Sequence, residues 1–245
     1  MRHGHRLDTA NDFSTITDEL WPDRHTRPYD TPLADTSEEL VVGVAADLQA
    51  HGLSTFDAIV CSPFRRCVQT AALVCRALGI KGARIVIDNR LGEYMPAANR
   101  SWKTAGIDPP GEYSYASADD VAHWAGVSPA DLLWDRDANP LLDEADENLY
   151  ERVQSIPVIC AEALKRVGVS GTSASPPAVL VVTHGDLINR FVPSFEFDDS
   201  IGRYSASECG WLACTGFEPL ADYEGDTIDL GLVPRVHASA GLEPL

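Results

Sequence analysis

The order of apolar and polar positions along the chain predicts strands and helices in alternation. Apolar runs with the length and β-branched content of buried strands occupy residues 56–61, 84–87 and 178–182. Apolar residues spaced three and four positions apart predict helices at residues 37–50, 65–78 and 147–166. Pro157 is expected to kink the last helix. This order predicts an α/β fold of three αβα layers, with a mostly parallel sheet and helices on both faces.

The segments between these elements are less regular. Residues 7–34 are polar and broken by prolines, so they predict a loop with short helical pieces. Residues 95–145 form a long insertion containing one predicted helix, near 118–126, with Ser117 as its cap. We expect a single domain, residues 1–245, in which this insertion is a lid or a substrate-specificity element rather than a surface excursion. Weaker patterns predict strands at 210–216 and 227–233, and the last dozen residues are expected to be disordered.

Charge and composition narrow the classes of partner. The 245 residues include 19 basic and 37 acidic side chains, which give a net charge of −18. This balance argues against nucleic acid and against an anionic membrane as the main partner, and it requires any phosphate site to be a local basic island. The six cysteines form no C-x-x-C pair, and the N-terminus has no apolar signal region. We therefore expect a soluble cytoplasmic protein with reduced cysteines.

The chain opens with the most suggestive chemistry in the sequence, Met1-Arg2-His3-Gly4-His5-Arg6. A neutral imidazole can attack phosphorus, arginine side chains can fork onto phosphate oxygens, and glycine lets the backbone approach a ligand closely. Such a histidine is expected at the carboxyl end of a buried strand, where open α/β sheets bind their ligands. Only Met1 precedes Arg2, so we expect the first strand to be truncated.

Three further polar features follow predicted strands. The segment Ser62-Pro63-Phe64-Arg65-Arg66-Cys67-Val68-Gln69-Thr70 follows the strand at 56–61, Glu93 follows the strand at 84–87, and His184-Gly185 follows the strand at 178–182. The carboxyl ends of parallel strands share one edge of a sheet. These features are therefore expected to converge on one pocket with the opening stretch.

Taken together, these features resemble the histidine phosphatase superfamily, also called phosphoglycerate mutase-like. The resemblance rests on Arg2-His3-Gly4, on the S-P-x-x-R-x-x-Q-T pattern at Ser62–Thr70, on Glu93 and on His184-Gly185, in that order. Glycine rather than aspartate follows His184, which favours branch 1. Within it, Arg2-His3-Gly4-x-Arg6-x-Asp8 is similar to the suppressor of T-cell receptor signalling proteins and the ecdysteroid-phosphate phosphatases.

The resemblance implies a role for each residue. His3 would be the nucleophile of a phosphomonoester hydrolase and would form a phosphohistidine. Phosphate oxygens would be held by Arg2, Arg6, Arg66 and His184. Glu93 would donate a proton to the leaving group. The reaction would need no metal and no cofactor, and the partner would be a phosphorylated small molecule or a phosphopeptide, not nucleic acid or a membrane.

Three alternatives stay open at this point. Histidine and aspartate at His3-x-His5 and His184-x-Asp186 could ligate a metal, although Arg2 and Arg6 would repel a cation. A weak or inactive member could bind a phosphorylated ligand or act as a scaffold. A phosphoglycerate mutase-type phosphotransferase would use the same nucleophile. The role of His5, the substrate and the oligomeric state are left open as well.

Overall fold

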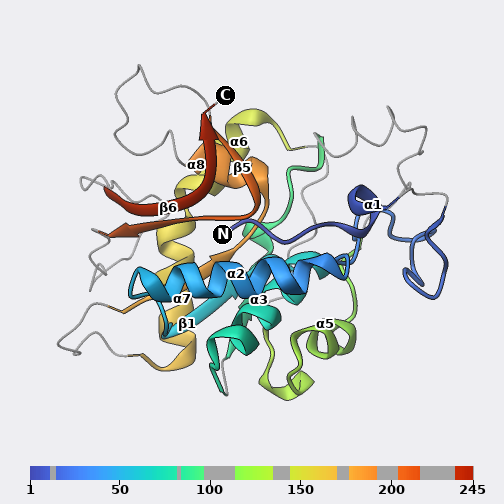
Figure 1. The fold of residues 1–245 in the computed structure, drawn as a ribbon, viewed down its shortest axis with the longest axis horizontal. Helices are drawn as coiled ribbons and strands as arrows, with labels where there is room; N and C mark the ends of the chain where they lie inside the picture. Colours follow the sequence, from blue (N-terminus) through green and yellow to red (C-terminus); the bar gives the residue numbers. More distant parts are fainter. Residues whose placement is uncertain are drawn as a thin grey trace.

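A parallel four-stranded sheet lies at the centre of the protein (Figure 1). The computed structural model describes residues 1–11, 15–81, 84–96, 114–134, 144–169, 177–191, 204–215 and 235–244. The strands are β1 (Ala58–Cys61), β2 (Ile85–Ile87), β3 (Leu133–Trp134) and β4 (Val179–Val182), in the order β3-β2-β1-β4. Every pair in this sheet is parallel, so the carboxyl ends of the strands share one edge.

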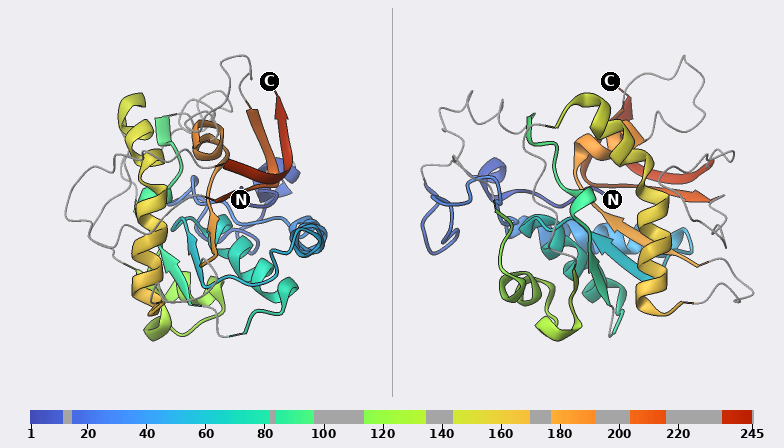
Figure 2. Two further views of the ribbon diagram at one scale, coloured as in Figure 1. Left: turned by 90° about the vertical axis from the view of Figure 1, so that its left-hand side faces the viewer. Right: turned by 180° about the vertical axis from the view of Figure 1, so that it is seen from behind.

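Helices cover both faces of the sheet, as the left view of Figure 2 shows. On one face, Ile59, Cys61 and their neighbours pack in a core with α2 (Thr36–Ala50), α3 (Arg65–Leu78) and α5 (Ala118–Ala125). On the other face, Ala58, Val60 and Val86 pack against α6 (Asp146–Gln154), α7 (Ile156–Val167) and α8 (Gly185–Phe191). Alternate residues of β1 thus enter opposite cores, which explains why the whole strand is apolar. The predicted three-layer α/β fold is confirmed.

Short elements complete the described chain. They are α1 (Leu7–Ala10) and the 3-10 helices η2 (Asn89–Leu91) and η3 (Pro129–Asp131). The predicted cap of α5 is present, since Ser117 and Asp120 form a reciprocal capping box. No helix among the described residues is both long and apolar enough to cross a bilayer.

The first three residues lie in the sheet beside β4. The ammonium group of Met1 donates to the carbonyl of Val181 at 2.9 Å, and the amide of His3 donates to the carbonyl of Thr183 at 3.0 Å. On the other side, Arg2 and His3 exchange backbone hydrogen bonds with Gly210 and Cys209. His3 is therefore held between two neighbouring strands, even though the sequence led us to expect a truncated first strand.

That second neighbour belongs to an antiparallel pair, β5 (Tyr204–Thr215) and β6 (Arg235–Pro244). Its register shifts between Ala206 and Trp211, and Cys209 in the bulge has a positive φ of 57°. The predicted disorder of the last dozen residues is wrong, because residues 235–244 pair along β5. The strand predicted at 210–216 overlaps the end of β5, whereas β6 was not predicted, because few of its residues are strongly apolar. The strand predicted at 227–233 lies outside the described residues.

Two further expectations need correction. The single kinked helix predicted at 147–166 is two helices, α6 and α7, that meet at Ser155. Pro157 lies in the first turn of α7, where its missing N–H costs no hydrogen bond. The insertion is partly structural, because β3 pairs with β2 at the sheet edge. Its role as a lid stays a prediction, and residues 97–113 and 135–143 lie outside the described part.

Candidate active site

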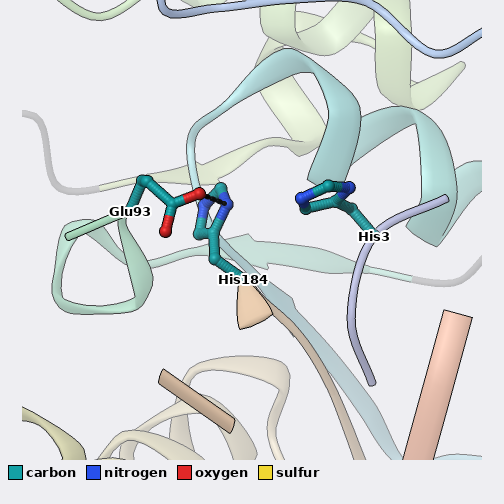
Figure 3. A group of neighbouring side chains, drawn as sticks. All are labelled: His3, Glu93 and His184. Atoms are coloured by element: carbon teal, nitrogen blue, oxygen red, sulfur yellow. Dashed lines mark ion pairs between the residues drawn. The ribbon is translucent and has the colours of Figure 1, made fainter. Parts of the chain in front are cut away.

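Four of the predicted residues meet at the carboxyl edge of the sheet. His3 follows the paired residues 1–2, Arg66 lies in the first turn of α3, Glu93 follows η2, and His184 follows β4. Figure 3 shows the imidazole of His3 and the carboxylate of Glu93 on either side of His184. The rings of His3 and His184 have centroids 5.4 Å apart. The topology thus brings together His3 and His184, which lie at opposite ends of the matched motifs in the sequence.

His3 has the properties of a neutral nucleophile. It is 2% exposed, and its Nδ1 lies 2.8 Å from the carbonyl oxygen of Gly4. A carbonyl can only accept, so Nδ1 carries the proton and Nε2 keeps its lone pair. Burial, reinforced by the charge of Arg66, holds the pKa of His3 well below its ordinary value. The imidazole is therefore uncharged and fixed in one orientation at neutral pH.

Arg66 supplies a buried cation at the same place. Its Nη1 donates to the carbonyl of Tyr29 at 2.9 Å, and its Nη2 lies 3.2 Å from Oε2 of Glu93 and 3.1 Å from Nδ1 of His184. Among the described residues, its buried Nε has no hydrogen-bond partner. The guanidinium carbon Cζ lies over the ring of Phe64, 4.8 Å from its centroid. The side chain of Arg66 is thus held in place, and its Nε can still donate a hydrogen bond to a ligand.

The hydrogen bonds around His184 fix its tautomer. A carboxylate can only accept, so Nδ1 of His184 carries the proton towards Glu93, and Nε2 is left to accept from the hydroxyl of Ser62 at 2.8 Å. The distance from Nδ1 of His184 to Oε2 of Glu93 is 3.1 Å, and the Oγ atom of Ser62 also accepts from the amide of Phe64. Burial lowers the pKa of His184 to about 4, although Glu93 opposes the shift. His184 is therefore a neutral donor.

Two donors consequently converge on one carboxylate oxygen of Glu93. Burial alone would raise the pKa of Glu93, but the contacts with His184 and with the permanently charged Arg66 outweigh it and hold the pKa well below its ordinary value. The amide of Tyr94 donates to the other oxygen at 3.2 Å. An anionic oxygen at this point is thus stabilised by a guanidinium and an imidazole N–H.

The segment Ser62–Thr70 holds this arrangement through residues to which the sequence assigned no role. Ser62 orients His184 as described. The hydroxyl of Thr70 accepts from the amide of Gly4 at 3.0 Å and donates to the carbonyl of Arg66 at 2.7 Å. The side chain of Gln69 accepts from the amide of Leu33 at 2.9 Å. Ser62, Gln69 and Thr70 are the S, Q and T of the S-P-x-x-R-x-x-Q-T pattern, so the sequence marked their positions but not their contacts.

Gly4 is required by close packing, and this leads to a first prediction. A Cβ atom on Gly4 would lie 2.9 Å from Oγ of Ser37, which is buried and donates to the carbonyl of His5. We expect Gly4→Ala to lower the free energy of unfolding by about 1–3 kcal/mol, as overpacking does. The matched control is Gly43→Ala in α2, where nothing lies within 4 Å of the added atom.

Urea denaturation of both variants measures the difference. Gly43→Ala is expected to raise the free energy of unfolding by about 0.5–1 kcal/mol, since alanine is the better helix former. Equal stability of Gly4→Ala and the wild type would show that the chain at Gly4 yields easily and that His3 is held less tightly than its contacts indicate.

The structure does not bring Arg2 and Arg6 into direct contact with these four residues. Arg2 donates to the carbonyl of Ala206 and lies 3.2 Å from Oε1 of Glu208. Nε and Nη2 of Arg6 each donate to one carboxylate oxygen of Asp8. Burial would lower the pKa of Arg6, but Asp8 raises it, with further contributions from Glu93 and Glu208. Arg6 is therefore within electrostatic reach of Glu93, and its place in the phosphate site stays a prediction, as does that of Arg2.

His5 lies apart from the centre. Its Nδ1 is 3.1 Å from the hydroxyl of Thr36 at the start of α2. The pair His3-x-His5 is thus not the metal-capable group of the described residues, which is His3, Glu93 and His184, with ligand atoms within 4.8 Å of one another. Nη2 of Arg66 already lies against two of these three. The fixed positive charge opposes a second cation and favours an anion.

Comparison with known proteins identifies the family. The sequence profile of the histidine phosphatase superfamily (branch 1) matches residues 17–205, well over half of the chain. The match begins after His3, so the opening stretch is an independent observation. No curated protein matches the chain.

A solved structure that is similar over nearly the whole chain supports the fold. The ecdysone phosphate phosphatase from Bombix mori, in complex with tungstate, is similar with a TM-score of 0.59 at 15% identity, over 94% of this chain and 96% of that one. Mycobacterial glucosyl-3-phosphoglycerate phosphatase has a TM-score of 0.47 at 19% identity, over 96% and 93% of the two chains. Phosphoglycerate mutase from Bacillus anthracis has 0.42 at 22%, over 80% and 77%. From its profile match, this chain belongs to branch 1 of the histidine phosphatase superfamily.

Proposed function

We propose that the protein is a phosphomonoester hydrolase that works through a phosphohistidine on His3. The observation that carries the proposal is the buried, neutral imidazole of His3 beside Arg66 and His184, whose N–H groups converge on one anionic oxygen. A phosphate oxygen at that point would be bound as the carboxylate oxygen of Glu93 is bound here. The charge that a transferring phosphoryl group spreads over its oxygens would be stabilised by the same donors.

The reaction balances with these residues alone. The lone pair on Nε2 of His3 attacks phosphorus, the bond from phosphorus to the leaving oxygen breaks, and that oxygen takes a proton from Glu93. Water then attacks the phosphohistidine, and the carboxylate of Glu93 takes the proton that this water loses. Inorganic phosphate leaves, and His3 and Glu93 return to their starting states. His3 and Glu93 lie on either side of His184, which suits an in-line displacement (Figure 3).

Glu93 must gain a proton to act as the acid. Its depressed pKa makes it a carboxylate at neutral pH, held by Arg66 and His184. A substrate phosphate that takes these donors would place negative charge beside Glu93 and raise its pKa. The substrate monoanion can bring the proton itself. Binding and protonation of Glu93 are therefore coupled in this proposal.

The pKa shifts predict an acidic optimum. In the free enzyme His3 must be neutral and Glu93 protonated, and both groups have pKa values below their ordinary ones. Above the pKa of Glu93 the protonated fraction keeps falling, so activity that depends on the acid should decrease continuously as pH rises. We expect kcat/KM for phenyl phosphate, divided by that for p-nitrophenyl phosphate, to fall steadily between about pH 5 and pH 8. Taking the ratio removes most of the effect that ionisation of the substrate phosphate has on the two rates.

In Glu93→Gln this ratio should be low and independent of pH, because the acid is gone. A ratio in the wild type that rises with pH would contradict the assignment of Glu93 as the proton donor. A depressed ratio in the variant that still follows pH would assign the acid to another group.

A panel of phosphorylated metabolites and phosphopeptides, with His3→Ala as control, tests the proposal and its two rivals. Hydrolysis that depends on His3 supports it. Binding of the same ligands without turnover by folded protein would identify a phosphate-binding scaffold instead. Transfer to an acceptor phosphate ester in place of water would identify a mutase. Metal content measured on the purified protein separates all three from a metallohydrolase.

The expected compartment is the cytoplasm. Cys61, Cys67, Cys75, Cys160 and Cys209 form no disulfide among the described residues. Burial raises the pKa of Cys61, Cys67, Cys75 and Cys209, and this suits inert thiols in a reducing environment.

A further inference from the structure

A buried ion pair lies directly behind the segment that carries Glu93. Glu144 lies at the end of the insertion, two residues before α6 begins at Asp146, and Arg152 lies in the last turn of α6. Their side chains are 0% and 5% exposed. Nε of Arg152 donates to Oε1 of Glu144 at 2.8 Å, and Nη2 donates to Oε2 at 2.6 Å. The two planar groups therefore form a bidentate pair that fixes the direction of the remaining guanidinium nitrogen.

That remaining nitrogen binds the chain next to Glu93. Nη1 of Arg152 donates to the carbonyl of Arg90 at 2.8 Å and to the carbonyl of Gly92 at 2.6 Å. The carbonyl between them, that of Leu91, accepts from the hydroxyl of Thr183 at 2.8 Å. The three consecutive carbonyls before Glu93 are thus each bound by a buried side chain. One of these side chains precedes His184, which Glu93 contacts.

We infer that Arg152 and Glu144 are positioning residues that set the place of the acid Glu93. Without the arginine, the carbonyls of Arg90 and Gly92 lose their buried donor, and the turn before Glu93 can shift. A lysine could not replace it, because a single ammonium lacks the planar fork that engages Glu144 and both carbonyls together. The inference rests on the proposed function for the meaning of Glu93, but the geometry of the turn stands without it.

The leaving group distinguishes a positioning role from a purely structural one. Phenyl phosphate has a poor leaving group that needs a proton, whereas p-nitrophenolate leaves without much help. We expect Arg152→Met to lower kcat/KM for phenyl phosphate by about 10-fold or more, part of the usual contribution of a general acid. The value for p-nitrophenyl phosphate should change by less than about 3-fold, since the nucleophile is untouched. Glu93→Gln sets the scale for complete loss of the acid.

Arg152→Met leaves Glu144 buried without a partner and is expected to lower the melting temperature. The double variant Glu144→Leu with Arg152→Met removes both charges and should recover much of that stability. It should keep the leaving-group defect, because the two carbonyls still lack a donor. Leu48→Ala, a buried change in α2 in the other core, is the control for lost stability alone. This variant should lower kcat/KM for both substrates by the same factor.

The inference would be overturned if the double variant lost kcat/KM equally for both substrates, or if it kept wild-type kcat/KM for both. If the wild type shows no turnover that depends on His3, the proposed function fails. Hydrogen exchange of the full chain then still tests whether Arg152 and Glu144 hold the turn before Glu93. Amides of residues 90–94 should exchange faster in the double variant than in the wild type, while those of β1 should not. Unchanged exchange at residues 90–94 would also overturn the inference.

Discussion

Replacing His3 with alanine is expected to lower kcat for p-nitrophenyl phosphate by about 10⁴-fold or more, the scale on which loss of a covalent nucleophile acts. The remaining residues can still bind and polarise the phosphate, but the lone pair that attacks phosphorus is lost. His184 cannot substitute, because its Nδ1 proton faces Glu93 and its Nε2 accepts from Ser62. Steady-state assay of the purified variant, with circular dichroism to verify folding, measures the effect.

The matched control is His123→Ala, since His123 is exposed on α5. It should retain wild-type activity within about 2-fold, the range of a surface substitution. Activity of His3→Ala above about one hundredth of the wild type would show that another group attacks phosphorus.

Arg66 carries the second large effect. Its guanidinium lies against both Glu93 and His184, and its Nη1 is anchored on the carbonyl of Tyr29. We expect Arg66→Met to lower kcat/KM by about 10²–10³-fold, as removal of one preorganised donor to a developing anion does. Arg66→Lys should recover only a small part, because an ammonium cannot engage Tyr29 and the phosphate oxygens together. Steady-state kinetics with p-nitrophenyl phosphate measures both.

The neighbouring arginine offers a close control. Arg65 begins the same helix, but it stacks on Trp124 at 5.1 Å and lies 3.8 Å from Asp23. Arg65→Met should therefore stay within about 3-fold of the wild type. Similar losses in the two variants would mean that general basic charge at the start of α3, and not the bound geometry of Arg66, supports activity.

Much of the fold could be predicted because β1 and β4 are continuous apolar runs with a helix after each. The predicted α3 at residues 65–78 agrees with its observed bounds. β3 was not predicted, because two residues, Leu133 and Trp134, give no periodicity to detect. The break at Ser155 was missed for the opposite reason, since the apolar stripe of α6 continues into α7. Only tertiary packing separates the two helices.

The candidate site was predictable where polar residues follow buried strands. The segments that carry Arg66, Glu93 and His184 were found in this way, His3 was found from the opening stretch, and the family resemblance supplied their roles. The structure brings the four residues together. Arg152 was not identified, because in the sequence it is one charged residue on a helix and looks like a solvated one. Its burial, its pairing with Glu144 and its bonds to the turn before Glu93 exist only in the folded chain. Likewise, nothing in the opening stretch shows that Arg2 turns towards Glu208.

Identification of the phosphorylated residue tests the central claim most directly. Wild-type protein is mixed with a labelled phosphomonoester, quenched in alkali, where phosphohistidine survives, and digested with trypsin. Our account predicts that the label lies in the peptide His3–Arg6, that fragmentation places it on His3 and not on His5, and that His3→Ala carries none. Label on another residue, or turnover by the wild type with no phosphoenzyme on His3 at any time after mixing, would contradict it.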